Sequence, residues 1–439
     1  MKAFFIIFGK ESKKTTAMNV LIVGSGGREH TLAWKISQSP VLDKLYIAPG
    51  NGGTPSVGEN VPIEMGNFEE IRRFVLDYQI GMVVVGPEQP LVDGIVDYFR
   101  DDLVLNRIPV IGPEKKGALL EGSKDYANRF MDKYGIPTAK FRSFSAGQLE
   151  QAQAYLRELP APYVLKADGL AAGKGVVIAR DLDEAENTLK EFFEGKFGEA
   201  SKKVVIEEFL EGKELSAFVL TDGKSYKMFP PAKDYKRAGE KDTGPNTGGM
   251  GALSPVPYAG EAFLEKIRQQ IIEPTMKGLK EERIDYRGFL YFGLMKVGDQ
   301  PYVIEYNVRM GDPEAQVVIP RMRSDLLEAM DAVAHQRLDS YNLELEEDYA
   351  ATVILASAGY PGKYEKGKPI TLPGDNKEVQ VFHAGTKQEG GHLLTAGGRV
   401  MAVTALAPDF GQALSAVYKN IDSIDFEGKY YRKDIGYDL

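Results

Sequence analysis

The sequence predicts a multidomain protein of the α/β and α+β classes. It has a parallel α/β domain at its N-terminus and a mixed β/α module at its C-terminus. The length of 439 residues exceeds what one ordinary hydrophobic core supports. Short apolar runs alternate with helical patterns over residues 18–120, which is typical of a parallel sheet. After residue 121 the strand-like runs come in pairs, which indicates α+β structure.

The composition excludes several classes of function. A net charge of −9 disfavours binding to nucleic acid or to an anionic membrane, because both present phosphates. No apolar stretch approaches about 18 residues, so we expect no membrane partner. The absence of cysteine excludes disulfides, thiolate nucleophiles and cysteine zinc sites. A reducing, cytoplasmic location fits this composition.

Residues 1–17 are predicted to be a leader outside the folded domains. The apolar run at 4–8 is shorter than a secretory hydrophobic region, and polar and charged residues follow it. A buried strand is expected from about residue 18 onward.

The N-terminal domain is predicted over residues 18–120. Residues 19–24 form an apolar run that ends in glycine, and residues 31–37 have helical composition. This is the pattern of a strand, a glycine turn and a helix. The remaining predicted strands are 44–48, 82–86 and 110–112, and the remaining predicted helices are 68–79 and 91–101.

Three glycine- or proline-containing turns in this domain are candidate substrate-binding loops. Residues 24–30 lie where a strand gives way to a helix, whose free amides and dipole favour a phosphate. The turn is not a dinucleotide fingerprint, because Glu29 stands where a third glycine is required. Turns at 48–53 and 86–88 also follow strands, so all three converge at one sheet edge. The candidate residues are Gly26, Gly27, Arg28, Glu29, Gly52, Gly53, Pro87 and Glu88.

The central region is predicted over residues 121–340 and contains a small α+β lid over about 140–212. A helix from 121 to 134 ends at a Gly-Ile-Pro sequence. Two hairpins follow, and a helix at 183–194 separates them. The hairpins join 163–166 with 176–179, and 204–208 with 215–221.

The loop between Lys166 and Gly175 resembles a phosphate-binding loop but lacks the Walker spacing. A strand follows it instead of a helix, and Gly175 stands where that motif needs Ser or Thr. A glycine-rich hairpin loop can fold its amides over triphosphate oxygens, with Lys166 as a positive charge. Gly173, Lys174 and Gly175 are therefore candidate nucleotide-binding residues.

Residues 205–210 form a strand that ends in two acids and two apolar residues. Glu207, Glu208, Phe209 and Leu210 could offer backbone groups to an adenine edge while side chains pack on its faces. Glu214 could then bind a ribose hydroxyl. The alternative is a strand end with solvated acids, and the segment alone favours that alternative.

Residues 228–257 are rich in glycine and proline and are predicted to be a long loop. Loops of this length are usually functional or disordered. Its segment 244–251 contains four glycines with polar residues between them, which indicates a mobile cover over a substrate. The candidate residues in this cover are Pro245, Asn246, Thr247, Gly248 and Gly249.

Strands are predicted at 288–297 and 300–306, and the second leads into the strongest metal-site candidate. Because successive side chains of a strand point to opposite faces, Glu305, Asn307 and Arg309 are expected on the same face. Two oxygen ligands beside an arginine suit a Mg²⁺ ion that bridges nucleotide phosphates. Gly311 and Asp312 follow as candidate substrate residues. A helix is predicted at 324–335.

The C-terminal module is predicted over residues 345–439. Its predicted strands are 351–356, 379–384 and 398–404, and its one predicted helix is 410–420.

Taken together, the motifs resemble those of the glycinamide ribonucleotide synthetase family of ATP-grasp ligases, over nearly all of residues 18–439. They stand in the family's order. They are Gly-x-Gly-Gly-Arg-Glu-His at 24–30, Glu-Gly-Ser-Lys at 121–124, the glycine loop at 166–175, Gly-Pro-Asn-Thr-Gly-Gly-Met-Gly at 244–251 and Gly-Asp-Pro-Glu at 311–314.

The resemblance implies an ATP-grasp core that joins glycine to 5-phosphoribosylamine through glycyl phosphate, using ATP and Mg²⁺ or Mn²⁺. It places Lys124 and Lys166 on ATP phosphates, the 207–210 segment on adenine and Glu214 on ribose. Glu305 and Asn307 would hold the metal. It further implies Arg309 for the glycine carboxylate or acyl phosphate, and Asp234 or Asp242 for orienting an amine.

Alternatives remain open from the sequence. The nearest is another purine-pathway ATP-grasp ligase that acts on bicarbonate or formate, since its nucleotide site would look alike. A non-catalytic nucleotide-binding protein is a second, although Glu305, Asn307, Lys124 and Lys166 are all present. An assignment of the protein as a dehydrogenase would depend on residues 20–30 alone. We expect a monomer.

Overall fold

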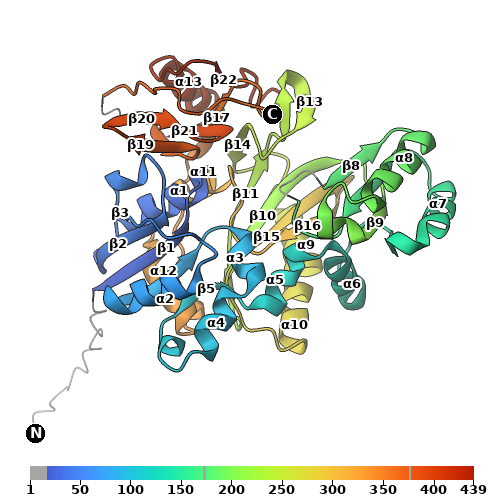
Figure 1. The fold of residues 1–439 in the computed structure, drawn as a ribbon, viewed down its shortest axis with the longest axis horizontal. Helices are drawn as coiled ribbons and strands as arrows, with labels where there is room; N and C mark the ends of the chain where they lie inside the picture. Colours follow the sequence, from blue (N-terminus) through green and yellow to red (C-terminus); the bar gives the residue numbers. More distant parts are fainter. Residues whose placement is uncertain (1–16, 172–174, 375–376) are drawn as a thin grey trace, which may run out of the picture.

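The computed structural model describes residues 17–171, 175–374 and 377–439, and one large sheet runs through it (Figure 1). The predicted leader thus lies outside the described residues except for residue 17. The neighbouring strands of this sheet are, in order, β18-β21-β17-β14-β11-β10-β15-β5-β4-β1-β2-β3, with β16 beside β15 and β22 beside β17. Smaller sheets are β6-β9-β7-β8, β12-β13 and β19-β20.

The predicted parallel N-terminal α/β domain is confirmed. Its strands run parallel and are β1 (Met18–Gly24), β2 (Leu42–Pro49), β3 (Glu59–Asn60), β4 (Ile80–Val85) and β5 (Val110–Pro113). Its helices are α1 (Gly27–Ile36), α2 (Phe68–Asp77), α3 (Glu88–Asp93) and α4 (Ile95–Asp101). The single helix predicted at 91–101 is wrong. Gly94 adopts φ 95° and breaks it into α3 and α4, because glycine tolerates this left-handed conformation.

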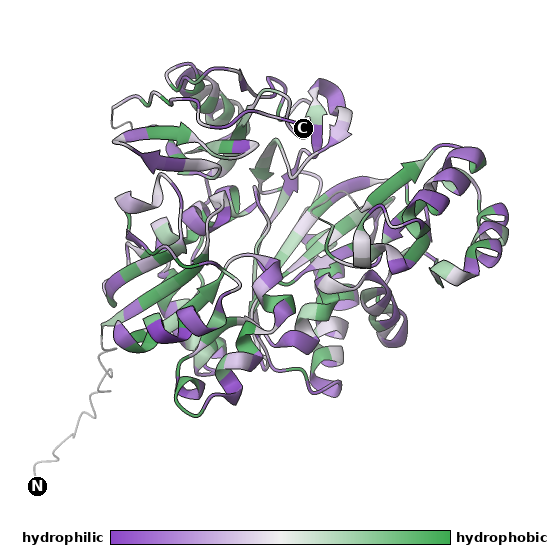
Figure 2. Ribbon diagram, in the orientation of Figure 1, coloured by the Kyte–Doolittle hydropathy of each residue, from purple (hydrophilic) through white to green (hydrophobic). Residues whose placement is uncertain are grey.

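The apolar run of β1 is continuous because both faces of the sheet are covered. Val20 and Ile22 pack into one core, which includes Leu32 of α1. Leu21 and Val23 pack into the opposite core, which α2 also enters. The hydropathy colouring shows the central strands largely apolar and the outer helices with polar surfaces (Figure 2). Burial on both faces fixes β1, and with it the loop that follows it.

Two helices replace the single helix predicted at 121–134. They are α5 (Lys115–Gly122) and α6 (Lys124–Tyr134). Ser123 separates them in an extended conformation, and its Oγ accepts a hydrogen bond from the Tyr126 amide at 3.1 Å. Serine is a favoured N-cap for this reason, and the cap starts α6 at Lys124.

The smaller four-stranded sheet carries α7 (Leu149–Glu158) and α8 (Leu182–Phe193) and projects to the right in Figure 1. Its strands are β6 (Phe141–Ser145), β7 (Tyr163–Ala167), β8 (Val176–Ala179) and β9 (Lys203–Glu208). The β7–β8 hairpin is confirmed. The second predicted hairpin is wrong, because β9 pairs with β6 and β7 while β10 (Lys213–Thr221) pairs with β11 and β15. An apolar run predicts a strand but not its partner.

Residues 228–257 are not the predicted loop. They contain most of β11 (Tyr226–Asp234), then β12 (Arg237–Gly239), β13 (Thr243–Asn246) and β14 (Gly251–Ser254). β14 pairs with β11 on one side and β17 on the other, so this segment joins two parts of the large sheet. Most of these strands have two to four residues or contain glycine and proline, which conceals their periodicity.

The two strands predicted at 288–297 and 300–306 are confirmed as β15 (Tyr286–Val297) and β16 (Gln300–Asn307), and they pair as an antiparallel hairpin. Around it lie α9 (Glu261–Ile267), α10 (Glu273–Glu281), α11 (Ala315–Val318) and α12 (Leu326–Ala334). The C-terminal strands are β17 (Tyr349–Ser357), β18 (Gln380–His383), β19 (Thr386–Glu389), β20 (His392–Thr395), β21 (Arg399–Ala407) and β22 (Lys429–Tyr430), with α13 (Phe410–Ile421). These strands and α13 build their own hydrophobic core. Within the described residues, no helix has the length and apolar character needed to cross a bilayer.

The C-terminal segment of the chain contacts the β12–β13 hairpin and the turn within it through Arg432. The guanidinium of Arg432 is fully buried, and it contacts Asp242 at 2.6 Å and Asp434 at 2.8 Å. It also lies 5.3 Å from the centre of the Tyr235 ring. Asp242, predicted to orient an amine, is therefore engaged with the C-terminal segment in this structure.

We expect Arg432→Met to lower the free energy of unfolding by about 2–3 kcal/mol, because it removes charge-assisted hydrogen bonds from a fully buried guanidinium, while the two partly exposed carboxylates can be solvated. Urea denaturation measures the change. Arg323→Met is the control, since Arg323 is exposed and, within the described residues, its one ion pair is with exposed Glu344. Its effect should stay below about 1 kcal/mol. Equal effects of the two substitutions would contradict the assigned role of Arg432.

Candidate active site

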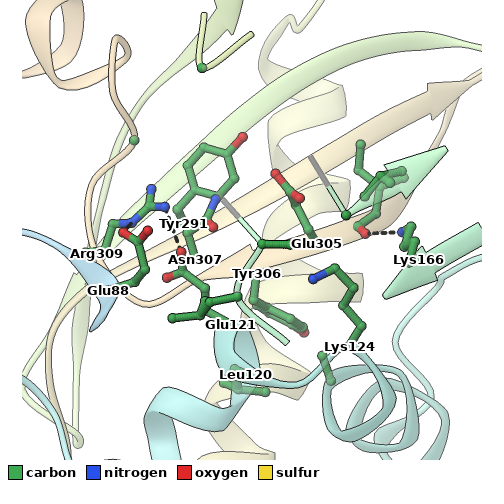
Figure 3. Close-up of a pocket in the computed structure, with 18 of the residues that line it drawn as sticks. Glu88, Leu120, Glu121, Lys124, Lys166, Tyr291, Glu305, Tyr306, Asn307 and Arg309 are labelled. Carbon is green, nitrogen blue, oxygen red and sulfur yellow. Dashed lines mark hydrogen bonds and ion pairs between the residues drawn. The ribbon is translucent and has the colours of Figure 1, made fainter. Parts of the chain in front are cut away.

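A cavity of about 370 Å³ opens where the N-terminal domain, the small sheet, the β15–β16 hairpin and the C-terminal module meet (Figure 3). Many of the predicted site residues line it. They are Arg28, Glu88, Lys124, Lys166, Gly175, Glu207, Asp234, Thr247, Gly248, Glu305, Asn307, Arg309, Gly311 and Asp312.

Other predicted site residues lie outside the lining of this cavity. Gly173 and Lys174 fall outside the described residues. Those that are described but do not line the cavity are Gly26, Gly27, Glu29, Gly52, Gly53, Pro87, Glu208, Phe209, Leu210, Glu214, Asp242, Pro245, Asn246 and Gly249.

Two lysines define one end of the cavity. Lys166 Nζ lies 2.7 Å from Glu207 Oε2 and donates to the Ile304 carbonyl at 2.9 Å. The other oxygen of Glu207 accepts a hydrogen bond from Asn128 Nδ2 at 2.8 Å. Lys124 Nζ donates to the Gly169 carbonyl at 3.0 Å, and burial lowers the pKa of this ammonium group. Both lysines are thus held beside the glycine-rich turn between β7 and β8.

Glu305 and Asn307 lie at the end of β16 and point into the cavity (Figure 3). Among the described residues, neither side chain has a hydrogen-bond or ion-pair partner. A carboxylate and an amide oxygen with free lone pairs fit a Mg²⁺ ion, which takes few protein ligands and keeps several waters. No group of three or more His, Cys, Asp and Glu side chains in the described residues could hold a metal. This excludes a closed zinc-type cage there but not a two-ligand Mg²⁺ site.

Arg309 lies between two glutamates on the opposite side of the cavity (Figure 3). Its guanidinium is 2.6 Å from Glu121 Oε1 and 3.2 Å from Glu88 Oε2. Glu121 also accepts the Val308 amide at 2.7 Å. Burial raises the pKa of Glu121 to about 7, although the charge of Arg309 opposes this rise. The two carboxylates hold the planar guanidinium in an orientation in which it lines the cavity.

A cluster of charged side chains lies near the metal candidate Glu305. Lys236 Nζ donates to Asp234 Oδ1 at 2.8 Å and to Glu214 Oε2 at 2.9 Å. Burial raises the pKa of Asp234, and burial together with the charge of Asp234 raises the pKa of Glu314 to about 7. Glu214, predicted to bind ribose, therefore has Lys236 as its partner in this structure.

The three N-terminal loops converge as predicted. The Gly50 amide donates to the Gly24 carbonyl at 3.2 Å. Glu29 accepts hydrogen bonds from the Gly26 amide at 2.5 Å and from Arg28 Nε at 2.6 Å. A Cβ atom on Gly86 would lie only 2.1 Å from Glu29 Oε1, so glycine is required there. Glu29 thus positions Arg28 without itself lining the cavity.

The C-terminal module docks directly onto these loops. Asn51 Nδ2 donates to the His383 carbonyl at 2.8 Å, and the Gly52 amide donates to the Thr386 carbonyl at 3.1 Å. The His383 amide donates to His30 Nδ1 at 2.8 Å. Burial lowers the pKa of His30 to about 3 and that of His383 to about 4, so both imidazoles are neutral at pH 7.

Several lining residues were not assigned roles from the sequence. Glu121 and Glu314 stand inside the motifs at 121–124 and 311–314, which were the available signal, and Lys236 lies in the glycine- and proline-rich segment 228–257. Asn128 lies four residues after Lys124 on α6, and helical spacing could have placed it on the same face. Tyr291 and Arg399 carry no local signal.

Comparison with known families decides the affiliation. Models described as phosphoribosylglycinamide synthetase N domain, ATP-grasp (A) domain and C domain match residues 18–121, 122–315 and 350–438. The chain belongs to the phosphoribosylglycinamide synthetase family. In the terms of this family, Arg28 and Glu88 come from the N domain and Arg399 from the C domain. Lys124, Lys166 and Glu305 lie in the ATP-grasp domain, and Glu121 is the last residue that the N-domain model matches.

Individual relatives agree with this affiliation. The phosphoribosylamine–glycine ligase of Chlorobaculum tepidum is 47% identical over 95% of this chain and 99% of its own length. The enzyme of the same name from Rhizobium meliloti is 48% identical over 96% and 98%. A solved structure of phosphoribosylamine–glycine ligase from Thermotoga maritima is 37% identical with a TM-score of 0.82, over 95% and 99% of the two chains.

More distant structures share the fold alone. The biotin carboxylase domain of Hydrogenobacter thermophilus 2-oxoglutarate carboxylase is 16% identical with a TM-score of 0.72, over 94% of this chain and 92% of that one. That structure is a complex with ADP, its magnesium salt and bicarbonate. Phosphoribosylglycinamide synthetase members therefore share their ATP-grasp architecture with carboxylases that act on a different substrate.

Proposed function

We propose that this chain is an ATP-dependent ligase that joins glycine to 5-phosphoribosylamine, giving glycinamide ribonucleotide, ADP and phosphate. The observation that carries the proposal is the cavity itself. It brings two lysines, two unpartnered oxygen ligands and a held arginine together with loops from the N and C domains. Close relatives with this name span the whole domain arrangement.

The first half of the reaction forms glycyl phosphate. A carboxylate oxygen of glycine attacks the terminal phosphorus of ATP, and ADP leaves with the bonding electron pair. Lys124 and Lys166 would neutralise phosphate charge, and the turn from Gly169 to Gly175 would cover the phosphates. Phe209 and Leu210 would pack on adenine, and Glu214 would bind ribose. Arg309 would bind the glycine carboxylate through its planar fork.

Glu305 and Asn307 would hold Mg²⁺, or Mn²⁺ in its place. Mg²⁺ supplies charge neutralisation between the nucleotide phosphates when bound. Support comes from the two free oxygen ligands and from the magnesium-bound nucleotide in an ATP-grasp neighbour. Either hard cation suits these ligands.

The second half forms the amide. The amine nitrogen attacks the acyl carbon, a carbon–nitrogen bond forms, and phosphate leaves with one oxygen from glycine. Asp234 lines the cavity and would orient the amine. The loop containing Thr247 and Gly248 would cover the amine substrate.

ADP release tests this proposal with purified protein, ATP, Mg²⁺ and freshly generated phosphoribosylamine, with and without glycine. We expect release that requires both glycine and the amine, with glycinamide ribonucleotide as product. Release with bicarbonate or formate in place of glycine would overturn the substrate assignment. If no ADP appears with any of these acids, the chain is a nucleotide-binding protein without this activity.

A further inference from the structure

Arg399 is the one cavity-lining residue that the described part of the C-terminal module contributes. Its Nη1 donates to the Gly248 carbonyl at 2.6 Å and to the Asp312 carbonyl at 2.7 Å. Its Nη2 lies 3.3 Å from Asp312 Oδ1. The guanidinium therefore joins the C-terminal module to the cover loop and to Asp312, and its position is fixed by three separate contacts.

These contacts leave part of the guanidinium free. A guanidinium carries five N–H groups, and Nη1 uses both of its own on the two carbonyls. One N–H of Nη2 faces Asp312. The Nε–H and the second Nη2–H have no partner among the described residues, and they lie on one edge of the planar group. Such an edge binds an oxyanion through two parallel hydrogen bonds.

A second arginine and a helix terminus lie on the other side of Asp312. The Arg28 amide donates to Asp312 Oδ2 at 3.2 Å. The Arg28 side chain is 8% exposed, and it is held by Glu29 and by the Met310 carbonyl at 3.1 Å. Its Nη2 has no partner within the described chain, and α1 begins one residue earlier. Free arginine donors beside the N-terminus of a ten-residue helix favour a phosphate.

We propose that Arg399, together with Arg28 at the start of α1, binds the phosphate monoester of the amine substrate. The inference rests on the proposed function and adds that the C-terminal module contributes a substrate contact. A phosphate monoester is a dianion with three outer oxygens, so it can use donors from two arginines at once. The two lysines contact Gly169, Glu207 and Ile304 and share no hydrogen-bond or ion-pair partner with Arg28 or Arg399 among the described residues, so the two arginines are available to the second substrate.

Arg399→Gln tests the proposal, and Tyr360→Phe is the matched control. Tyr360 also belongs to the C-terminal module, and its hydroxyl accepts the Gly248 amide at 3.0 Å, so it holds the same loop without a charge. We expect Arg399→Gln to raise KM for phosphoribosylamine about 10- to 100-fold, as for the loss of charge-assisted hydrogen bonds. KM for ATP and glycine should change less than about threefold, and Tyr360→Phe should leave all three nearly unchanged.

Two further measurements separate phosphate binding from loop positioning. Glycine-dependent ADP release with hydroxylamine, an amine without phosphate, should be unchanged in Arg399→Gln. Inhibition by ribose 5-phosphate, a stable monoester, should weaken by about 10- to 100-fold. Equal losses with both amines, or a raised KM for glycine alone, would overturn the proposal. Thermal melting reports whether the variant is folded. If it is not, Arg399→Lys replaces it, and unaltered ribose 5-phosphate inhibition in that variant would overturn the proposal.

Failure of the proposed function is distinguishable from failure of this inference. If the wild-type protein makes no product from phosphoribosylamine, the ligase assignment falls. Calorimetric titration with ribose 5-phosphate, with ribose as the control, still reports on the phosphate site. No difference between ribose 5-phosphate and ribose in the wild-type protein would overturn the site itself.

Discussion

Replacing Glu305 with alanine is expected to lower the rate of ADP release at least about 100-fold while leaving the protein folded. The carboxylate lines the cavity, and it has no hydrogen-bond or ion-pair partner in the described chain. Its removal therefore takes away a metal ligand worth several kcal/mol in the transition state and leaves no buried group unpaired.

The measurement is steady-state ADP release over a Mg²⁺ titration, together with a thermal melt. Glu305→Gln should lose nearly as much activity, since an amide oxygen is a weaker ligand than a carboxylate. Glu64→Ala, at an exposed position, is the control and should be active. Near-normal turnover of Glu305→Ala at saturating Mg²⁺ would contradict the metal assignment.

Replacing Arg309 with glutamine is expected to damage both stability and activity. The side chain is the shared partner of Glu88 and Glu121, so its loss leaves two acids facing one another in a buried place. We expect the free energy of unfolding to fall by about 3–5 kcal/mol. Turnover should fall about 100-fold, because a carboxylate or acyl phosphate loses a bidentate donor.

A double variant separates these two effects. Arg309→Gln with Glu121→Gln should recover much of the stability, because one of the unpaired charges is gone, but should not recover turnover. The loss of stability in the single variant should also lessen as the pH falls below 7. Burial already raises the pKa of Glu121 to about 7, so the acid becomes neutral there. Urea denaturation at pH 6 and pH 8 measures this. Recovery of turnover in the double variant would contradict the substrate role.

Much of the fold could be predicted because local patterns and global structure agree. The run before Gly24 is buried on both faces and is followed by a glycine turn, so strand, loop and helix were all visible. The sequence also predicted both strands β15 and β16, although not their pairing. The pairing of strands was harder to predict. The chain passes from one sheet to another between β9 and β10, and no hydrophobic periodicity in the sequence indicates this change of sheet.

The site was predictable where one motif supplies several side chains. The segment 305–312 places Glu305, Asn307, Arg309 and Asp312 around one cavity. Sequence reasoning did not find Arg399, because its role depends on contact with Gly248 of the cover loop, which lies 151 residues away in the sequence. It also assigned Asp242 to the amine, whereas the buried Arg432 holds that carboxylate at the C-terminal segment.

Oxygen transfer tests the central claim most directly. Glycine labelled with ¹⁸O in its carboxylate is incubated with the protein, ATP, Mg²⁺ and phosphoribosylamine, and the inorganic phosphate is analysed by mass spectrometry. An acyl phosphate intermediate predicts one ¹⁸O atom in each phosphate, formed in step with glycinamide ribonucleotide. Product that forms with unlabelled phosphate would contradict carboxylate activation by phosphorylation, and with it the chemistry assigned to this cavity.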